Sequence, residues 1–209
     1  MTARVHPLVP PLLALVSGFV DSAAFVRMSG LFVAHVTGNF VLLGAALAGT
    51  VGGSDVALQL AVFPCFFAAA LLAARILQSD DSARTTERQI TFAALAVGLS
   101  SCSETLPGVA WIAALVLVAA MATLNAAQRA DIRLGPPFSV MTGNATALAT
   151  YFAKPTSEGA RAARGSAILL GSFTAGCLVG AQAGAAFGFT AMLAPFLALV
   201  LVRFLLWDC

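Results

Sequence analysis

The stretch His35-Val36-Thr37-Gly38-Asn39 lies inside an apolar tract, and Val140-Met141-Thr142-Gly143-Asn144 repeats its pattern 105 residues later. Each Thr-Gly-Asn is followed by about ten apolar or small residues and then by a polar break. Because the spacing is half of a chain of 209 residues, it indicates a duplication. The repeated feature is polar, glycine-containing backbone within apolar sequence, and we expect the fold to be arranged around it.

The composition is typical of an integral membrane protein. Hydrophobic residues make up 60% of the chain and charged residues 10%, with a mean hydropathy of +0.94, whereas soluble domains carry about 25% charged residues. A run of about 20 apolar residues spans a bilayer, and several such runs follow one another. We therefore predict an all-α, multi-pass membrane protein. The first run carries Asp21 and lacks a clean cleavage site, so we interpret it as a retained helix rather than a signal peptide.

The apolar runs predict six spanning helices and two short helices in a single membrane domain. The expected spans are residues 8–28, 56–77, 90–103, 109–130, 165–187 and 190–207, and the expected short helices are 38–49 and 142–152. Extended segments at 31–36, which is rich in β-forming residues, and at 134–140 precede the short helices, and a polar loop is expected at 78–89. A halfway turn at Leu106-Pro107-Gly108 divides the chain into two repeats, 1–105 and 106–209.

The two short helices are predicted to be re-entrant half-helices. Eleven or twelve residues reach only about 17 Å, roughly half of the ~30 Å hydrocarbon core. If each enters and leaves on one side, and the N-terminus is cytoplasmic, then Arg27 is the only one of the eleven Lys and Arg residues on the outside, as the positive-inside rule favours. Two fully spanning short segments would put six of the eleven outside. Each repeat then has an odd number of spans, so the second is predicted to be inverted relative to the first, with both termini cytoplasmic.

Two half-helix N-termini that meet near the midplane would form a binding site for a small anion or polar solute. Helix starts carry unpaired N–H groups and a partial positive charge, and broken helices at matching places of two repeats are typical of transporter sites. A threonine can cap the helix, a glycine allows close approach and an asparagine offers a donor and an acceptor. The alternative is that these residues only satisfy buried helix starts. The candidate substrate-binding residues are Thr37, Gly38, Asn39, Thr142, Gly143 and Asn144.

Asp21 is the acid that lies clearly inside an apolar span, and its counterpart in the second repeat is Asn125. An intramembrane carboxylate is a functional candidate, and here it suits proton coupling. His35 lies at about the same depth and is a candidate proton relay. The alternatives are that Asp21 pairs with Arg27 or caps neighbouring backbone, and that His35 is a hydrogen-bonded filler.

Gln128 and Arg129 are expected near the cytoplasmic mouth of this site, where Arg129, Asp131 and Arg133 are interpreted mainly as an interfacial anchor. The four cysteines have no Cys-x-x-Cys spacing and the chain has two histidines. We therefore predict no metal, no disulfide framework and no cofactor.

Two predicted helices carry small residues at every fourth position, a spacing that permits close helix packing in lipid. Their packing partner could lie within the chain or in a second subunit, so a homodimer through these faces is an open alternative. The two faces are Ser172, Gly176, Gly180, Gly184 and Gly188, and Ala57, Ala61, Cys65, Ala69 and Ala73.

Several of these motifs resemble those of the YoaK-like family of bacterial inner-membrane proteins. The matching stretches are Gly18-Phe19-Val20-Asp21, Gly30-Leu31-Phe32-Val33-Ala34-His35-Val36-Thr37-Gly38-Asn39, Asn125-Ala126 and Val140-Met141-Thr142-Gly143. The resemblance covers nearly the whole chain and implies a bacterial multi-pass inner-membrane protein of about this size, without an established substrate or catalytic residue. As architecture only, the half-helix pair is similar to the core of nucleobase and sulfate transporters.

The sequence therefore favours a small secondary transporter for a small anion or polar solute, with proton coupling through Asp21 as a further hypothesis. One alternative is an anion channel of the same architecture, and another is a non-transport membrane scaffold or sensor. An enzyme is not predicted, because the chain has no HExxH motif, no nucleophile elbow and few acids or histidines. The expected partners are the solute, protons and the lipid bilayer; nucleic acid is not expected at a net charge of +2.

Overall fold

The computed structural model describes residues 5–50, 55–105 and 108–207. Within these ranges the chain is helical and has no strand, which confirms the all-α prediction. The α-helices are α1 (Val9–Arg27), α2 (Val36–Leu47), α3 (Val56–Ile76), α4 (Ser82–Ser101), α5 (Ala110–Ala130), α6 (Met141–Ala153), α7 (Ser157–Phe187) and α8 (Leu193–Trp207). Three short 3₁₀ turns are η1 (Cys102–Thr105), η2 (Ile132–Leu134) and η3 (Gly188–Met192). The expected halfway turn falls mostly on residues 106 and 107, outside the described ranges.

Several helices have the length and apolarity needed to cross a membrane. They are α1, α3, α5 and a helical run from Gly159 to Leu206 that contains both α7 and α8. The predicted span at 90–103 falls on the second part of α4 and the start of η1. Helix α4 carries Arg84, Glu87 and Arg88 in its first turns and is too polar to count as a span by composition. The apolar helices are thus compatible with a membrane protein.

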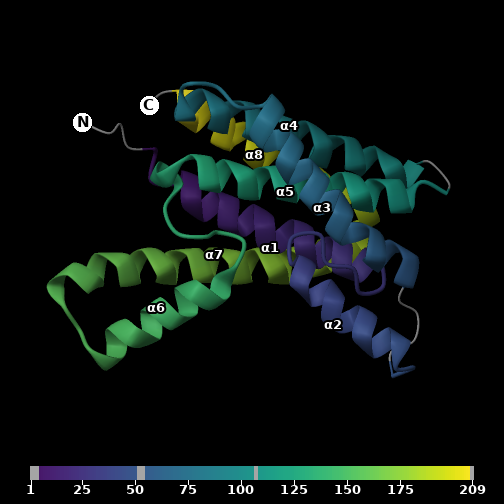
Figure 1. Cartoon of the computed structure of the whole chain (residues 1–209), viewed down its shortest axis with the longest axis horizontal. Helices are drawn as coiled ribbons and strands as arrows, with labels where there is room; N and C mark the ends of the chain where they lie inside the picture. Colours follow the sequence, from purple (N-terminus) through teal and green to yellow (C-terminus); the bar gives the residue numbers. More distant parts are fainter. Residues whose placement is uncertain (1–4, 51–54, 106–107, 208–209) are drawn as a thin grey trace.

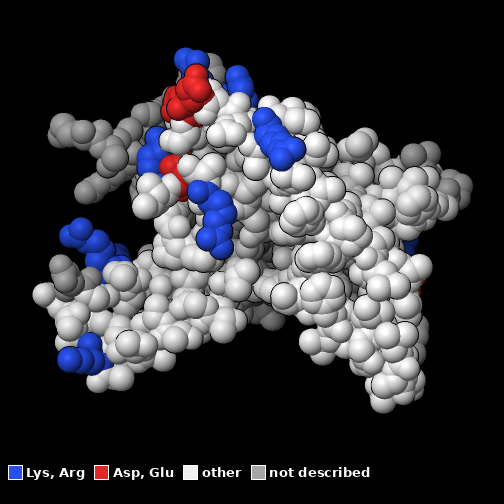
Figure 2. All heavy atoms as spheres, viewed as in Figure 1, with Lys and Arg blue, Asp and Glu red and all other residues white. Residues whose placement is uncertain are grey.

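Figure 1 shows how the helices are arranged: α1, α3, α4, α5, α7 and α8 run between the two ends of the molecule, with the start of α1 and the end of α8 at the same end. The short helices α2 and α6 begin nearer the middle and run obliquely toward opposite ends. Most of the Lys and Arg side chains visible in Figure 2 lie toward the end that holds the start of α1.

The helix pairings of the first half have counterparts in the second half. If α1, α2, α3 and α4 are matched to α5, α6, α7 and α8, then the packing of α1 on α7 corresponds to that of α5 on α3. Likewise α2 packs on α3 as α6 packs on α7, and α4 packs on α5 as α8 packs on α1. The two halves therefore interlock, because each contributes a helix to the other's packing.

The small-residue face of α7 packs on α1 within the same chain. A Cβ atom added to Gly176 or Gly180 would collide with the backbone of Leu15 or Phe19, and one added to Gly184 would lie 2.7 Å from Ala23 Cα. The small-residue face of α3 likewise meets α5, where the Cys65 thiol donates to the carbonyl of Leu115 at 3.6 Å. A homodimer would therefore need a surface other than the glycine face of α7.

Two helices begin earlier than the apolar runs predict. Helix α4 begins at Ser82, inside the expected loop at 78–89, because the Asp81 carboxylate accepts a hydrogen bond from the Ala83 N–H at 2.9 Å. Helix α7 begins at Ser157 instead of residue 165, with the Thr156 hydroxyl accepting from the Gly159 N–H at 3.0 Å. In both places N-cap chemistry starts a helix in polar sequence, which hydropathy alone does not detect.

The segments before the short helices are bent rather than β-like. Residues 31–35 form no strand, so the expected β character at 31–36 is wrong. Gly30 and Gly135 have φ of +104° and +78°, a region that glycine adopts without a steric cost, and each turns the chain back toward its short helix. Helix α2 spans 36–47 rather than 38–49, and α6 spans 141–153 rather than 142–152.

Candidate functional site

Asp21 holds the bend that leads into α2. Asp21 is 3% exposed, and its Oδ1 accepts hydrogen bonds from the backbone N–H groups of Val33 (2.8 Å) and Ala34 (2.7 Å). The other oxygen, Oδ2, lies 2.6 Å from Nδ1 of His35. One carboxylate therefore fixes three consecutive residues of the bend, and two of the sequence-predicted residues, Asp21 and His35, are in direct contact.

Asn39 closes the same bend from the first turn of α2. Its side-chain oxygen accepts from the Phe32 N–H at 3.0 Å, and its Nδ2 donates to the Phe32 carbonyl at 2.7 Å. Asn39 is 1% exposed. Its amide thus binds the backbone of the chain in this structure, which corresponds to the alternative that the sequence analysis left open for the asparagines.

The second bend repeats this plan without the charge. Asn125 Oδ1 accepts from the Ser139 hydroxyl at 2.6 Å, and these two residues are 14 positions apart, as are Asp21 and His35. Asn144 Nδ2 donates to the Pro137 carbonyl at 2.6 Å, which matches the bond from Asn39 to Phe32. The two bonds between Asn39 and Phe32 form a clasp on the backbone. Because proline has no N–H, the bond from the backbone N–H to the side-chain oxygen cannot form at Pro137.

The two threonines of the repeated motif lie inside their helices. Thr37 and Thr142 are the second residues of α2 and α6, so the expectation that they occupy the N-cap position is wrong. The N-cap residues are His35 and Val140, and neither makes a side-chain capping bond. The first turn of each short helix therefore starts without a side-chain cap.

The two motif glycines differ in how they are covered. A Cβ atom added to Gly38 would lie 2.7 Å from the ring of Phe32, whereas nothing lies within 4 Å of the corresponding position on Gly143. Phe32 also packs against Phe25, with ring centroids 4.6 Å apart. At the start of α2 the Phe32 ring therefore covers Gly38, whereas at the start of α6 the position of Gly143 is open.

The open start of α6 borders two hollows. A groove of about 670 Å³ between α6 and α7 includes the candidate residues Thr142 and Gly143 and ends near Lys154. A cavity of about 490 Å³ lies between the end of α5 and the start of α6, lined by Asn125, Gln128, Arg129, Ile132, Gly135, Pro137 and Val140. Both volumes fall within the range of about 300–1,000 Å³ that is usual for ligand sites.

The predicted site residues thus form two groups rather than one. Asp21, His35 and Asn39 gather at the start of α2, which packs mainly on α3, and the counterpart group with Asn125 and Asn144 gathers at the start of α6, which packs mainly on α7. His35 also reaches across to α7, where its ring lies 5.6 Å from that of Phe173.

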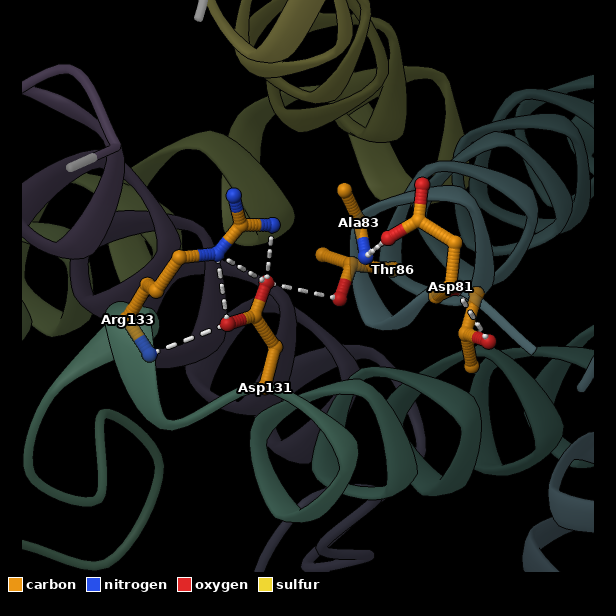
Figure 3. A network of polar contacts seen from close by, with 6 residues as sticks. Asp81, Ala83, Thr86, Asp131 and Arg133 are labelled. Atoms are coloured by element: carbon orange, nitrogen blue, oxygen red, sulfur yellow. Dashed lines mark hydrogen bonds and ion pairs between the residues drawn. The ribbon is translucent and has the colours of Figure 1, made fainter. Parts of the chain in front are cut away.

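A polar network secures the end of α5, next to the open cavity. Arg133 donates to both oxygens of Asp131 at 2.7–3.1 Å, and the Thr86 hydroxyl on α4 donates to Asp131 Oδ2 at 3.1 Å, as Figure 3 shows. Burial alone would raise the pKa of the Asp131 carboxyl, but its bonds with Arg133 and Thr86 outweigh burial and hold that pKa below its usual value. Asp131 and Arg133 therefore join α5 to α4, which is consistent with an anchor.

The corresponding network at the opposite end was not predicted. Glu104 in η1 forms an ion pair with Arg27 at 2.9 Å and accepts from the Phe189 N–H of η3 at 2.8 Å. The bond with Arg27, followed by that from Phe189, lowers the pKa of the Glu104 carboxyl. Arg27 is therefore engaged by Glu104, and the alternative pairing of Arg27 with Asp21 is not what the structure contains.

Within the described residues, no group of three or more His, Cys, Asp and Glu residues is placed to hold a metal ion. Cys65, Cys102 and Cys177 are free thiols, and Cys209 lies outside the described residues. The prediction of a metal-free and cofactor-free site remains a prediction.

Sequence reasoning missed two contributors to the site, Ser139 and Phe32, and the ion pair of Glu104 with Arg27 outside it. A signal for Ser139 was present, because it follows Asn125 by the same 14 positions by which His35 follows Asp21. Glu104 is 77 positions from Arg27, and nothing in the local sequence links the two.

Comparison with known proteins yields one match. Residues 11–205 match the model of a family described as a protein of unknown function, DUF1275. No curated protein and no solved structure matches the chain.

Proposed function

The chain belongs to the DUF1275 family of proteins of unknown function, and we propose that it is a small secondary transporter for a small anion or polar solute. The observation that carries this proposal is the contrast between two half-helix starts: Phe32 covers Gly38 in the first, whereas Gly143 in the second is open and a cavity of about 490 Å³ with Asn125, Gln128 and Arg129 in its wall lies beside it. The solute would bind at the uncapped starts of α2 and α6, where N–H groups and helix dipoles favour negative charge.

The proposal includes six helices that cross the membrane, α2 and α6 as re-entrant half-helices, and two inverted repeats. Helices of 12 and 13 residues reach only about 20 Å at 1.5 Å per residue, less than the ~30 Å core. Their opposite directions in Figure 1 and the matched helix pairings favour inversion. The clustering of Lys and Arg near the start of α1 in Figure 2 favours a cytoplasmic location for both termini.

We further propose that Asp21 couples transport to protons, with His35 as its relay. The buried carboxylate bonds to two backbone N–H groups and to His35, so a change in its protonation would alter the bonds that hold the start of α2. Coupling would then follow from a two-state bend rather than from contact between Asp21 and the solute.

The placement in a bacterial inner membrane and the YoaK-like assignment are parts of the proposal that rest on sequence resemblance. We also propose a non-enzymatic role. An anion channel of the same architecture is less favoured, because a channel needs a continuous pore whereas the Phe32 ring covers Gly38 at one half-helix start. A scaffold or sensor role predicts that the motif threonines can be replaced by alanine without loss of activity in the cell.

Flux into proteoliposomes tests the transport proposal. We expect uptake of small anions such as acetate or sulfate to depend on an imposed pH gradient, to fall at least tenfold in the Thr37→Ala/Thr142→Ala double variant, and to lose its pH dependence in Asp21→Asn. Asp80→Asn, which changes an exposed acid before α4, is the matched control and should behave as the unchanged protein. Flux that persists in the double variant would rule out the two half-helix starts as the solute site.

Thiol labelling tests the inverted topology. In a cysteine-free background, single cysteines at Ala83 and Ser157, at the starts of α4 and α7, should both react only from the cytoplasmic side. Reaction at position 83 from the outside would contradict the inverted-repeat arrangement.

A further inference from the structure

The cavity beside α6 has a polar wall that its counterpart in the first half lacks. Gln128 and Arg129 lie on the last turn of α5 and line the cavity together with Asn125. Val140, the N-cap residue of α6, lines it too. A guanidinium and two amides therefore face one hollow at the open half-helix start.

The equivalent positions in the first half are filled by aromatic rings. Matching Asn125 to Asp21 places Phe25 where the second half has Arg129, and matching the two asparagine clasps places Phe32 where it has Pro137. The two rings pack together, with centroids 4.6 Å apart, and the Phe32 ring lies over Gly38. The duplicated scaffold thus carries an apolar plug in one half and a basic cavity in the other.

Asp131, the acid two positions after Arg129, does not neutralise the charge of Arg129. Asp131 is bound by Arg133 and by Thr86, and among the described residues no ion pair of Arg129 is present. Asp80 borders a neighbouring hollow that Arg129 also lines, without an ion pair between the two. Such an uncompensated guanidinium attracts an anion, and its planar set of donors matches an oxyanion with two oxygens.

The amides around Arg129 restrict what can bind. Asn125 uses Oδ1 on Ser139 and one Nδ2 hydrogen on the Met121 carbonyl, which leaves one N–H to donate. Gln128 brings a further amide to the same wall. The available groups are therefore mostly donors, which favours an acceptor-rich ligand over a cation.

We propose that this cavity is a binding site for a small oxyanion, held by Arg129 with Gln128 and Asn125 as secondary donors. The inference rests on the proposed function in one respect, namely that the site would be the side from which the transporter loads its solute. Binding itself can be measured without transport, so the two proposals can fail separately.

Binding of sodium acetate and sodium sulfate to the purified full-length chain in detergent micelles tests the site. Calorimetric titration at constant ionic strength should detect at least one of the two anions for the unchanged protein. Arg129→Gln should weaken that binding at least tenfold, and Arg129→Lys should weaken it less, because lysine keeps the charge but loses the paired donors. Arg75→Gln, at the exposed end of α3 and outside the cavity, should leave affinity unchanged.

The unfolding temperature of each variant without ligand separates loss of binding from loss of folding. Equal affinity in Arg129→Gln and the unchanged protein would overturn the site, as would absence of binding of both anions to the unchanged protein. Binding that depends on Arg129 without flux in proteoliposomes would keep the oxyanion site and overturn the transporter. Flux that is insensitive to Arg129→Gln would keep the transporter and overturn the role of this cavity as the side from which it loads its solute.

Discussion

The bends before α2 and α6 share a hydrogen-bond plan but differ in charge and in closure. In the first, a buried carboxylate and an asparagine together make five hydrogen bonds to the bend, and Phe32 covers the helix start. In the second, Asn125 and Asn144 make one neutral bond each to Ser139 and Pro137, and the helix start is open. The two halves thus share this hydrogen-bond geometry but differ in chemistry.

We propose that this difference gives the two halves separate tasks in transport. The first bend is held by more bonds and by an ionic acceptor, so it should open less readily than the second. The second bend borders the basic cavity at Arg129. We infer that a solute is handled at the second half, whereas the titratable group that could bias the cycle sits in the first.

The largest contrast is expected between Asp21→Ala and Asn125→Ala. Removing Asp21 leaves the buried N–H groups of Val33 and Ala34 without an acceptor, at about 2 kcal/mol each, so a loss of about 4 kcal/mol is expected. Removing Asn125 frees only the Ser139 hydroxyl, which can rotate, and should cost about 1 kcal/mol. Denaturant unfolding in detergent micelles measures both values.

The control for this pair is Asp21→Asn, which keeps an oxygen for the two N–H groups and should recover most of the lost stability. Equal losses in Asp21→Ala and Asn125→Ala would mean that the charge adds nothing to the bend. The functional division between the two halves would then lose its physical basis.

A second contrast concerns the networks at the ends of α1 and α5. Asp131 is 1% exposed and is bound by Arg133 and Thr86, so Asp131→Asn should cost about 2–3 kcal/mol. Side chains of Arg27 and Glu104 are 40% and 30% exposed, so solvent screening should limit the cost of Glu104→Gln to under about 1 kcal/mol. Thermal unfolding at pH 7 measures both.

The same pair predicts a pH dependence with a defined sign. The pKa of each carboxyl is lowered in the folded protein, so each contributes stability that is present above the unfolded-state pKa and is lost as the pH falls through the folded-state pKa. The unfolding temperature should therefore decrease when the pH is lowered below about 4. This decrease should be smaller in Asp131→Asn than in Glu104→Gln. An identical acid profile in Asp131→Asn and the unchanged chain would contradict the role of that network.

Helix positions along the chain were largely predictable, because long apolar runs leave few alternatives to a helix. The exceptions, the starts of α4 and α7, lie where Asp81 and Thr156 cap helices that begin in polar sequence. There a local hydrogen bond decides the boundary, and hydropathy carries no information about it. The glycine face of α7 was recognisable as a packing surface, but its partner α1 lies about 160 positions away, and only the tertiary fold identifies it.

The candidate site was predictable as a set of residues but not as a set of contacts. The duplicated motif and Asp21 were identified from the sequence, and the contact of Asp21 with His35 fits their shared depth. The use of Asn39 as a backbone clasp and the cover of Phe32 on Gly38 depend on the exact path of the bend. One helix start is covered and the other is open because single residues differ at matched positions, Phe32 against Pro137 and Phe25 against Arg129. An alignment of the two halves could have found this difference.

A third and smaller contrast separates Asn39→Ala from Asn144→Ala. Asn39 satisfies both the N–H and the carbonyl of Phe32, so its loss should cost about 2 kcal/mol, whereas Asn144 satisfies the Pro137 carbonyl and should cost about 1 kcal/mol. Denaturant unfolding of the two variants measures the difference. A larger loss at Asn144 would mean that the second bend is the more tightly held of the two.

Pro137→Ala tests a single hydrogen bond of the second bend, and its expected effect on stability is the smallest of these variants. The new N–H would be placed as that of Phe32 is, and Asn144 could then make both bonds of the clasp, a gain of about 1 kcal/mol. Replacing proline also frees the unfolded chain, which costs about 0.4–1 kcal/mol, so the net change in stability should be close to zero. Hydrogen exchange separates the two terms, because only a completed clasp slows exchange at the new amide. Fast exchange there would mean that the second bend follows a different path from the first, and that the shared plan of the two halves ends at Asn125 and Ser139.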